Sequence, residues 1–236
     1  MDATTSNVFC KAAHLAALAE LAYQPADVLR RAVTVIWRAW QHVIPFDNGN
    51  AQGFVCYDRN IAVVAIAGSN DLHDWLGNLM ANSSLALHPR GFWGHHGMLF
   101  HARLAENAIR YADSQLSIIF QTRRVYVTGH SLGGAVATLL PLLIRELEPE
   151  LVCTFGAPRV LSYATAGRYP YPVRRFVGPA DVVTLLPLPW LFSHVGYVRY
   201  VTTATNGELI AERRWGSLSK YWRLASTYGR SLLGRK

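Results

Sequence analysis

The sequence predicts an α/β fold in which helices cover both faces of a mostly parallel central sheet. Three observations lead to this prediction. Residues 61–67 form a run that is apolar throughout, as expected of a strand buried on both faces. Residues 123–128 form a second strand-like run, which passes through a glycine-rich turn into a helical run at 135–147. Two further buried-strand patterns follow at 152–155 and 173–177.

The length and composition are those of one folded domain. The chain has 236 residues, enough for a full hydrophobic core, and we expect residues 1–236 to form a single domain. Apolar residues make up 51% of the sequence and charged residues 16%, which argues against disorder. Cys10, Cys56 and Cys153 are odd in number and lack metal-ligand spacing, so we expect free thiols in a reducing compartment.

The first residues carry no basic segment followed by an apolar core, so they do not resemble a signal peptide. No uncharged run approaches the length of a membrane span. Together with the expected free thiols, these features favour a cytoplasmic protein, with peripheral attachment to a membrane left open.

The N-terminal part is expected to be helical over residues 8–44. Residues 8–23 carry apolar side chains at helical spacing, and Pro25 ends this pattern. Residues 26–43 form a second helical run, which Pro45 closes.

The sheet is predicted to begin with an antiparallel hairpin. Residues 53–57 have a strand pattern, and residues 58–60 form a tight turn into the apolar strand at 61–67. Residues 98–113 then have the pattern of an amphipathic helix. Between hairpin and helix, residues 76–94 lack clear periodicity, as do mobile apolar lids and ordinary surface loops alike.

The turn around Ser131 has the pattern Gly-x-Ser-x-Gly between a strand and a helix, which is typical of the nucleophile elbow of an α/β-hydrolase. Gly129 and Gly133 lack Cβ atoms, so strand and helix can pass close together and leave the Ser131 hydroxyl exposed at the strand end. The amide of Leu132, at the helix N-terminus, can face a developing oxyanion. The alternative is a tight turn that happens to contain a serine.

Two further residues follow predicted strands. Ser69 comes just after the strand at 61–67, where this fold places its second oxyanion donor. Asp181 comes just after the strand at 173–177 and later in the chain than Ser131, as expected of a catalytic acid. The alternative role for Ser69 is in an ordinary loop that caps a helix. The alternative role for Asp181 is that of a turn residue.

A basic C-terminal segment, residues 213–236, contributes much of the net charge of +8, and no acidic residue follows Glu212. Aromatic and leucine side chains are interleaved with its basic ones, a pattern that an anionic membrane surface would attract. A C-terminal helix packed on the body with a solvated basic face is the alternative. No nucleic-acid-binding motif is present, so we expect no nucleic-acid partner.

The residues around these positions resemble the class 3 lipases, the fungal triacylglycerol-lipase type of α/β-hydrolase. The matching pieces, between about residues 60 and 200, are Gly68-Ser69 with Asp74-Trp75, His95-His96-Gly97-Met98, Gly129-His130-Ser131-Leu132-Gly133-Gly134, Thr154 to Val160, Asp181-Val182-Val183 with Leu186-Pro187, and Ser193-His194-Val195-Gly196. The resemblance implies Ser131 as nucleophile, Asp181 as triad acid, Ser69 and Leu132 as the oxyanion hole, and a lid within residues 79–95.

One departure from the family concerns the catalytic histidine. The family's histidine lies near the C-terminus in an Asp-His pair with a tyrosine five residues after it, and here Trp215-Gly216 occupies that position with Tyr221 beyond. This position should come directly after an antiparallel C-terminal hairpin formed by residues 195–203 and 208–214. The last histidine in the chain is His194.

His194 is therefore the first candidate for the base, because it begins the strand after the Asp181 loop. A buried histidine that bridges loops is the alternative role for it. His130 adjoins Ser131, but the elbow should turn its side chain elsewhere, and His73 and His88 are more distant candidates.

The sequence thus predicts a serine hydrolase of carboxylic esters, a lipase or esterase acting on acyl esters or lipids through an acyl-enzyme on Ser131. This chemistry requires no cofactor and no metal, and the three histidines His88, His95 and His96 lack acidic or cysteine companions at ligand spacing. The alternative is a catalytically impaired, lipase-like protein that binds a lipid or a membrane.

Overall fold

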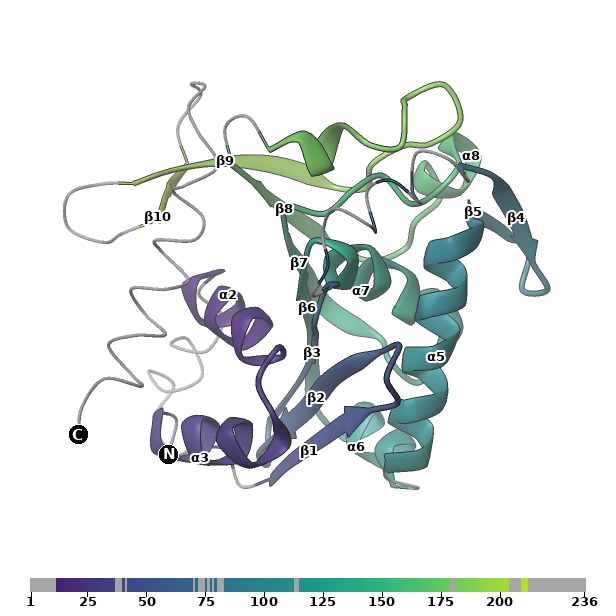
Figure 1. The fold of residues 1–236 in the computed structure, drawn as a ribbon. Helices are drawn as coiled ribbons and strands as arrows, with labels where there is room; N and C mark the ends of the chain where they lie inside the picture. Colours follow the sequence, from purple (N-terminus) through teal and green to yellow (C-terminus); the bar gives the residue numbers. More distant parts are fainter. Residues whose placement is uncertain are drawn as a thin grey trace.

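The computed structural model describes residues 12–36, 40, 42–69, 71, 75, 77, 79, 83–112, 115–178, 181–203 and 209–211. Within this part of the chain, eight strands form one twisted sheet in the order β1-β2-β3-β6-β7-β8-β9-β10 (Figure 1). The strands are β1 (His42–Asp47), β2 (Gln52–Tyr57), β3 (Ile61–Ile66), β6 (Arg124–His130), β7 (Pro149–Phe155), β8 (Val173–Val177), β9 (Tyr197–Thr203) and β10 (Leu209–Ala211).

The middle of this sheet is parallel and its two ends are antiparallel. Strands β3, β6, β7, β8 and β9 pair in parallel, whereas β1, β2 and β3 form an antiparallel meander. At the far edge, β10 pairs antiparallel with β9. The predicted α/β-hydrolase sheet with an antiparallel C-terminal hairpin is confirmed, and the turn of that hairpin lies outside the described residues.

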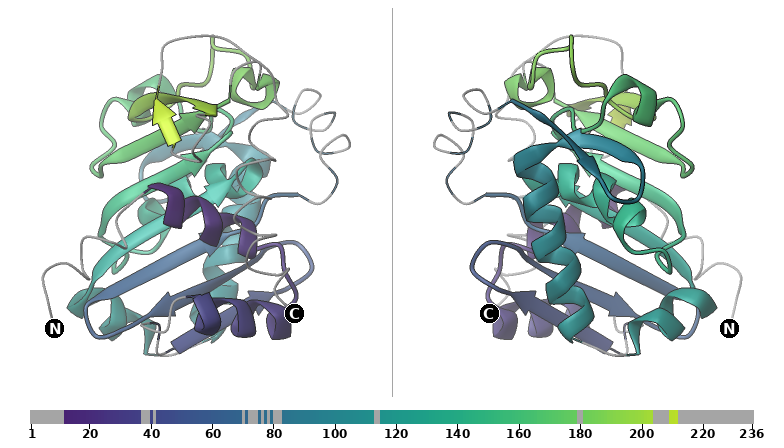
Figure 2. Two further views of the ribbon diagram at one scale, coloured as in Figure 1. Left: turned by 90° about the vertical axis from the view of Figure 1, so that its left-hand side faces the viewer. Right: turned by 90° about the vertical axis from the view of Figure 1, so that its right-hand side faces the viewer.

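Helices cover both faces of the sheet, and each face has its own core. Helices α2 (Ala12–Leu21) and α3 (Ala26–Ile36) lie on one face, and α5 (His96–Ala112) and α7 (Leu132–Leu143) lie on the other (Figure 2). Strand β3 serves both cores, since every one of its residues is buried. Val63 packs toward the α2 side and Val64 toward the α5 and α7 side, as the two-residue period of a strand requires.

The prediction of a helix up to residue 44 is wrong at its C-terminal end. Helix α3 ends at Ile36, and Val43 and Pro45 lie in the edge strand β1. Pro45 pairs with Phe54 of β2, and an edge strand tolerates proline because only one side of the strand needs its backbone donors. The first predicted helix is seen as α2, and residues 8–11 lie outside the described part.

The segment predicted without periodicity contains a second, small sheet. Strands β4 (Leu85–His88) and β5 (Phe92–His95) form an antiparallel hairpin that leads directly into α5. Further helices with described bounds are α6 (Leu116–Thr122), α8 (Tyr163–Ala166) and the 3₁₀ helix η1 (Val182–Leu185). Cys56 and Cys153 are buried free thiols. In the described ranges, no helix has the length and apolar character needed to span a membrane.

Candidate active site

The turn from β6 into α7 has the close packing that its glycines predict. A Cβ atom on Gly129 would lie 2.3 Å from the carbonyl oxygen of Gly133, and one on Gly133 would lie 2.3 Å from the carbonyl oxygen of Ile66. Real Cβ atoms do not approach backbone this closely, so glycine is required at both positions. The helix can therefore start directly against the ends of β6 and β3.

Ser131 lies at the apex of this turn in a strained conformation. Its φ of 53° and ψ of −126° fall in a region that residues with side chains rarely adopt. The amide of Ser131 donates to the carbonyl of Phe155 at 2.9 Å, which fixes the turn against the end of β7. The side-chain oxygen is buried and has no hydrogen-bond partner among the described residues.

The loop after β3 lies directly against Ser131. A Cβ atom on Gly68 would lie 3.3 Å from the Cβ of Ser131. The hydroxyl of the next residue, Ser69, donates to the carbonyl of Asp71 and accepts from its amide. Leu132 is the first residue of α7, so its amide has no acceptor within the helix. Ser69 and Leu132 thus flank the nucleophile from two different segments.

Asp181 follows β8 and caps η1. Its carboxylate accepts a hydrogen bond from the amide of Val183 at 3.1 Å. Burial raises the pKa of the carboxyl to about 6, although hydrogen bonds from the amides of Val183 and Thr184 act in the opposite direction. Gly156, at the end of β7, borders the carboxylate, because a Cβ atom there would lie 2.6 Å from Oδ2 of Asp181.

His194 lies beside the Asp181 loop without contacting Ser131 or Asp181 through a hydrogen bond. Its Nε2 is 2.8 Å from the carbonyl oxygen of Thr184, in η1, and therefore carries the ring proton. Burial lowers the pKa of His194 to about 3, and the positive charges of Arg175 and Arg159 act in the same direction. In this arrangement His194 connects two loops, and the structure does not bring it together with the nucleophile.

The ring of His130 has Tyr23, the second residue after α2, as a neighbour. Its Nδ1 is 3.0 Å from the hydroxyl of Tyr23, which also has a backbone hydrogen bond with Gly68. Burial lowers the pKa of His130 to about 4. The Nε2 atom lies on the other side of the ring, 3.7 Å from the position of a Cβ on Gly156. Tyr23 and Gly156 are therefore neighbours of the site that the sequence reasoning did not select.

Of the two more distant candidates for the base, His88 is in the described part of the chain and His73 is not. His88 is in β4, where its ring stacks on Phe92 at 4.8 Å between ring centroids. His73, Trp215 and Gly216 lie outside the described residues, as does the basic segment 213–236.

Comparisons with known proteins agree with this fold. The family model for class 3 lipases matches residues 63–190, more than half of the chain and the stretch that contains Ser69, Ser131 and Asp181. The chain belongs to the class 3 lipase family.

Two curated relatives illustrate the similarity. The chain is 33% identical over 103 residues to "Secreted mono- and diacylglycerol lipase 1" of Fusarium solani, covering 43% of this chain and 31% of the relative. It is 28% identical over 151 residues to "Lipase" of Rhizomucor miehei, covering 59% of this chain and 41% of the relative. The curated relatives it matches are thus covered over less than half of their length.

Among solved structures, the fold is similar to a lipase from Rhizopus microsporus var. chinensis, with a TM-score of 0.67 and 21% identity over 85% of this chain and 75% of that one. It is also similar to a triacylglycerol lipase whose catalytic centre is described as a serine protease triad, with a TM-score of 0.65, 23% identity, and coverage of 86% and 82%. These likenesses identify the fold as that of the fungal lipases.

Proposed function

We propose that this chain hydrolyses carboxylic esters through an acyl-enzyme formed on Ser131. The observation that carries the proposal is the elbow itself, in which Ser131 is held at a positive φ with its Oγ free of hydrogen bonds to the described residues. A serine on a strained strand-to-helix turn is the arrangement that presents a hydroxyl to a substrate carbonyl. Family membership supports an ester as the substrate.

In the proposed reaction, Oγ of Ser131 attacks the ester carbonyl carbon while a histidine accepts the hydroxyl proton. The carbonyl oxygen becomes an oxyanion, which the amides of Ser69 and Leu132 stabilise. The histidine then donates its proton to the leaving alcohol, and water releases the acid from the acyl-enzyme by the same steps in reverse. Asp181 orients the imidazole and stabilises its protonated form.

His194 is the proposed base, because one hydrogen bond joins it to the 3₁₀ helix that Asp181 caps. The bond to Thr184 occupies Nε2 and leaves Nδ1 as the unprotonated nitrogen, so Nδ1 accepts the proton unless the ring first leaves that carbonyl. The competing proposal is a site without its histidine, with Gly216 at the position where the base would normally lie.

Lipid-like acyl esters are the proposed substrates. The residues that follow Asp181 expose large apolar side chains to solvent, namely Val182, Leu185, Leu188 and Trp190. Trp190 is 71% exposed. An apolar surface of this kind beside the reactive groups suits an acyl chain or a lipid interface better than a polar substrate.

The test combines covalent labelling with a fluorophosphonate and hydrolysis of a short-chain nitrophenyl ester. We expect labelling and hydrolysis by the unchanged chain, and loss of both in Ser131→Ala. If His194 is the base, His194→Ala loses hydrolysis while it stays folded. Absence of labelling in the unchanged chain, with labelling gained in Gly216→His, would instead favour the impaired, lipid-binding protein, a reading that family membership does not favour.

We also propose that the basic segment 213–236 attaches the protein to anionic membrane surfaces, because its cationic and aromatic residues alternate. Sedimentation with anionic vesicles should recover the full chain and fail to recover a chain truncated before residue 217. Equal recovery of both would contradict this proposal.

A further inference from the structure

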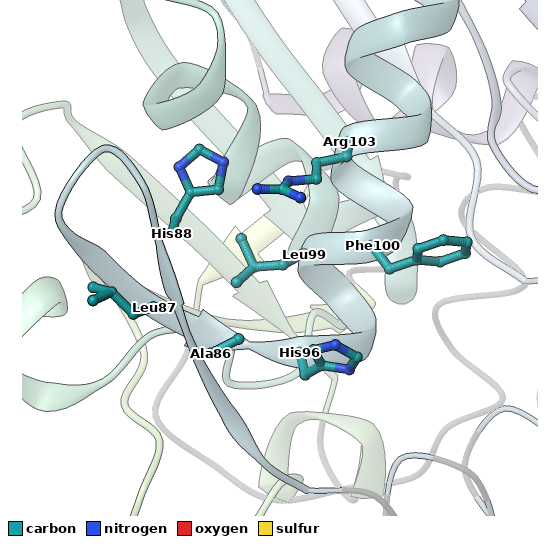
Figure 3. A pocket seen from close by; sticks show the side chains of 7 residues that line it. All are labelled: Ala86, Leu87, His88, His96, Leu99, Phe100 and Arg103. Carbon is teal, nitrogen blue, oxygen red and sulfur yellow. The ribbon is translucent and has the colours of Figure 1, made fainter.

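A small cavity lies between the β4–β5 hairpin and the first two turns of α5 (Figure 3). Its volume is about 300 Å³, at the lower end of the range in which small-molecule sites occur. The lining residues are Ala86, Leu87 and His88 from β4, and His96, Leu99, Phe100 and Arg103 from α5. None of them belongs to the candidate active site.

The lining is apolar over most of its area. Leu99 lies between the hairpin and the helix in Figure 3 and is buried, so it forms the floor. Leu87 and Phe100 also contribute to the lining and are 55% and 56% exposed. In Figure 3 the Leu87 side chain points away from the helix and the Phe100 ring points away from the hairpin, so they lie at the edges of the cavity. Exposed large apolar side chains around a cavity are a feature of sites that accept an apolar ligand.

One end of the cavity carries positive charge. In Figure 3 the guanidinium of Arg103 and the ring of His88 point toward one another across this end. Arg103 has no hydrogen bond or ion pair with any residue in the described ranges. The nearby carboxylate of Glu106 is already engaged by Arg110, at 3.2 Å.

The surroundings of His88 show the same excess of positive charge. Burial lowers the pKa of His88, and the charges of Arg103 and Arg90 lower it further, whereas Glu106 acts only weakly in the opposite direction. The Arg90 guanidinium is held by the carbonyl groups of Leu142 and Leu143, so it cannot swing away from the cavity freely. An anion at this end would meet the guanidinium of Arg103, whereas the charge of Arg90 also acts on the carboxylate of Glu146.

We propose that this cavity binds the carboxylate of a medium-chain fatty acid at Arg103 and its alkyl chain against Ala86 and Leu99, with Leu87 and Phe100 at the edges. A guanidinium suits a carboxylate because it offers paired N–H donors in one plane. The chemistry of the ligand is defined by the cavity alone, a single anionic group on an apolar chain. An ester hydrolase releases such an acid as its product. This link between the cavity and the reaction rests on the proposed function.

The test is calorimetric titration of decanoate into the Ser131→Ala protein, which cannot form an acyl-enzyme. We expect saturable binding of decanoate, no binding of acetate, which lacks the chain, and much weaker binding of decanol, which lacks the charge. Arg103→Gln should weaken decanoate binding about tenfold or more, the loss expected for a charge-assisted contact. Arg31→Gln, which removes one exposed charge from α3 on the opposite face of the sheet, should leave it unchanged.

The position of the ligand is read independently with a photoreactive diazirine analogue of decanoate and peptide mapping. Crosslinks within residues 85–103 support the proposal, and their loss in Leu87→Asp supports it further. Equal affinity in Arg103→Gln and the unchanged protein, or crosslinks confined to the segments around Ser131 and Asp181, would overturn it. Because these measurements use no ester, a failure of the hydrolase proposal, seen as absent fluorophosphonate labelling, is distinguishable from a failure of this one.

Discussion

The hydroxyl of Tyr23 lies 3.0 Å from Nδ1 of His130, and this contact joins the segment after α2 to the residue that precedes the nucleophile. The same hydroxyl has a hydrogen bond with the backbone of Gly68, beside the proposed oxyanion loop. One buried phenol therefore connects the N-terminal helices, the elbow and the loop after β3.

Tyr23→Phe should destabilise the protein without changing its fold. It removes the partner of a buried ring nitrogen, which costs about 1–3 kcal/mol, or roughly 2–4 °C in melting temperature for each kcal/mol. Calorimetry or thermal circular dichroism measures the shift. Tyr111→Phe is the matched control, because Tyr111 is 95% exposed and should show no change. Equal melting temperatures for Tyr23→Phe and the unchanged protein would show that the contact does not contribute.

Gly156→Ala should displace the carboxylate of Asp181. The new Cβ would lie 2.6 Å from Oδ2, and the φ of +59° adds a backbone penalty of about 1 kcal/mol or more. We expect reduced stability and loss of any activity that requires Asp181. Gly49→Ala is the matched control, since its φ is +80° but nothing lies within 4 Å of its Cβ position. If both variants lose the same stability and keep the same hydrolysis rate, the steric argument is wrong.

Asp181→Asn should stabilise the protein above pH 6. The pKa of Asp181 is raised from 3.8 to about 6, so between these pH values the unfolded chain releases a proton that the folded chain keeps. The unchanged protein therefore loses stability as the pH rises from about 4 to 6, and the loss is complete above that range. The asparagine variant should gain on the order of 2 kcal/mol at pH 7.5, and the gain should vanish near pH 4. Urea unfolding at the two pH values measures it.

His194→Ala should cost most stability at neutral pH. The ring is held neutral on the carbonyl of Thr184, so its removal should cost about 1–3 kcal/mol at pH 7.5. Because the pKa of His194 is lowered to about 3, the unfolded chain binds a proton near pH 5 that the folded chain does not, and the unchanged protein loses stability there. The difference between the two proteins should therefore shrink as the pH falls from 7.5 to 5. A difference that is constant with pH would contradict the buried, neutral ring.

Much of the sheet and the elbow could be predicted because their signals are local. Strand β3 is apolar at every position, and β8 has the predicted bounds of Val173–Val177. The elbow requires glycine at positions 129 and 133 for steric reasons, and the Gly-x-Ser-x-Gly spacing by itself indicates this requirement. Strand β1 was missed because Pro45 resembles a helix terminator unless one knows that the strand lies at an edge.

The remaining parts of the site depend on contacts between distant residues. Tyr23 and His130 are 107 positions apart, and nothing in the sequence near either residue indicates the other. His194 was selected by its position after the Asp181 loop, and it does lie beside that loop. Which acceptor its ring chooses is decided by side-chain packing and by the carbonyl of Thr184, and neither has a sequence signal.

The strained turn at Ser131 also ties chemical reactivity to the order of folding. The turn is held by the carbonyl of Phe155 on β7 and by the close packing of Gly133 on Ile66 of β3, so we expect it to form together with the pairing of these strands. Until β3, β6 and β7 are assembled, the serine is an ordinary hydroxyl on a flexible chain. Reactivity of Ser131 would then report whether the strands around it have assembled. A ribosome-bound chain that ends before β7 should remain inert toward a serine-directed reagent.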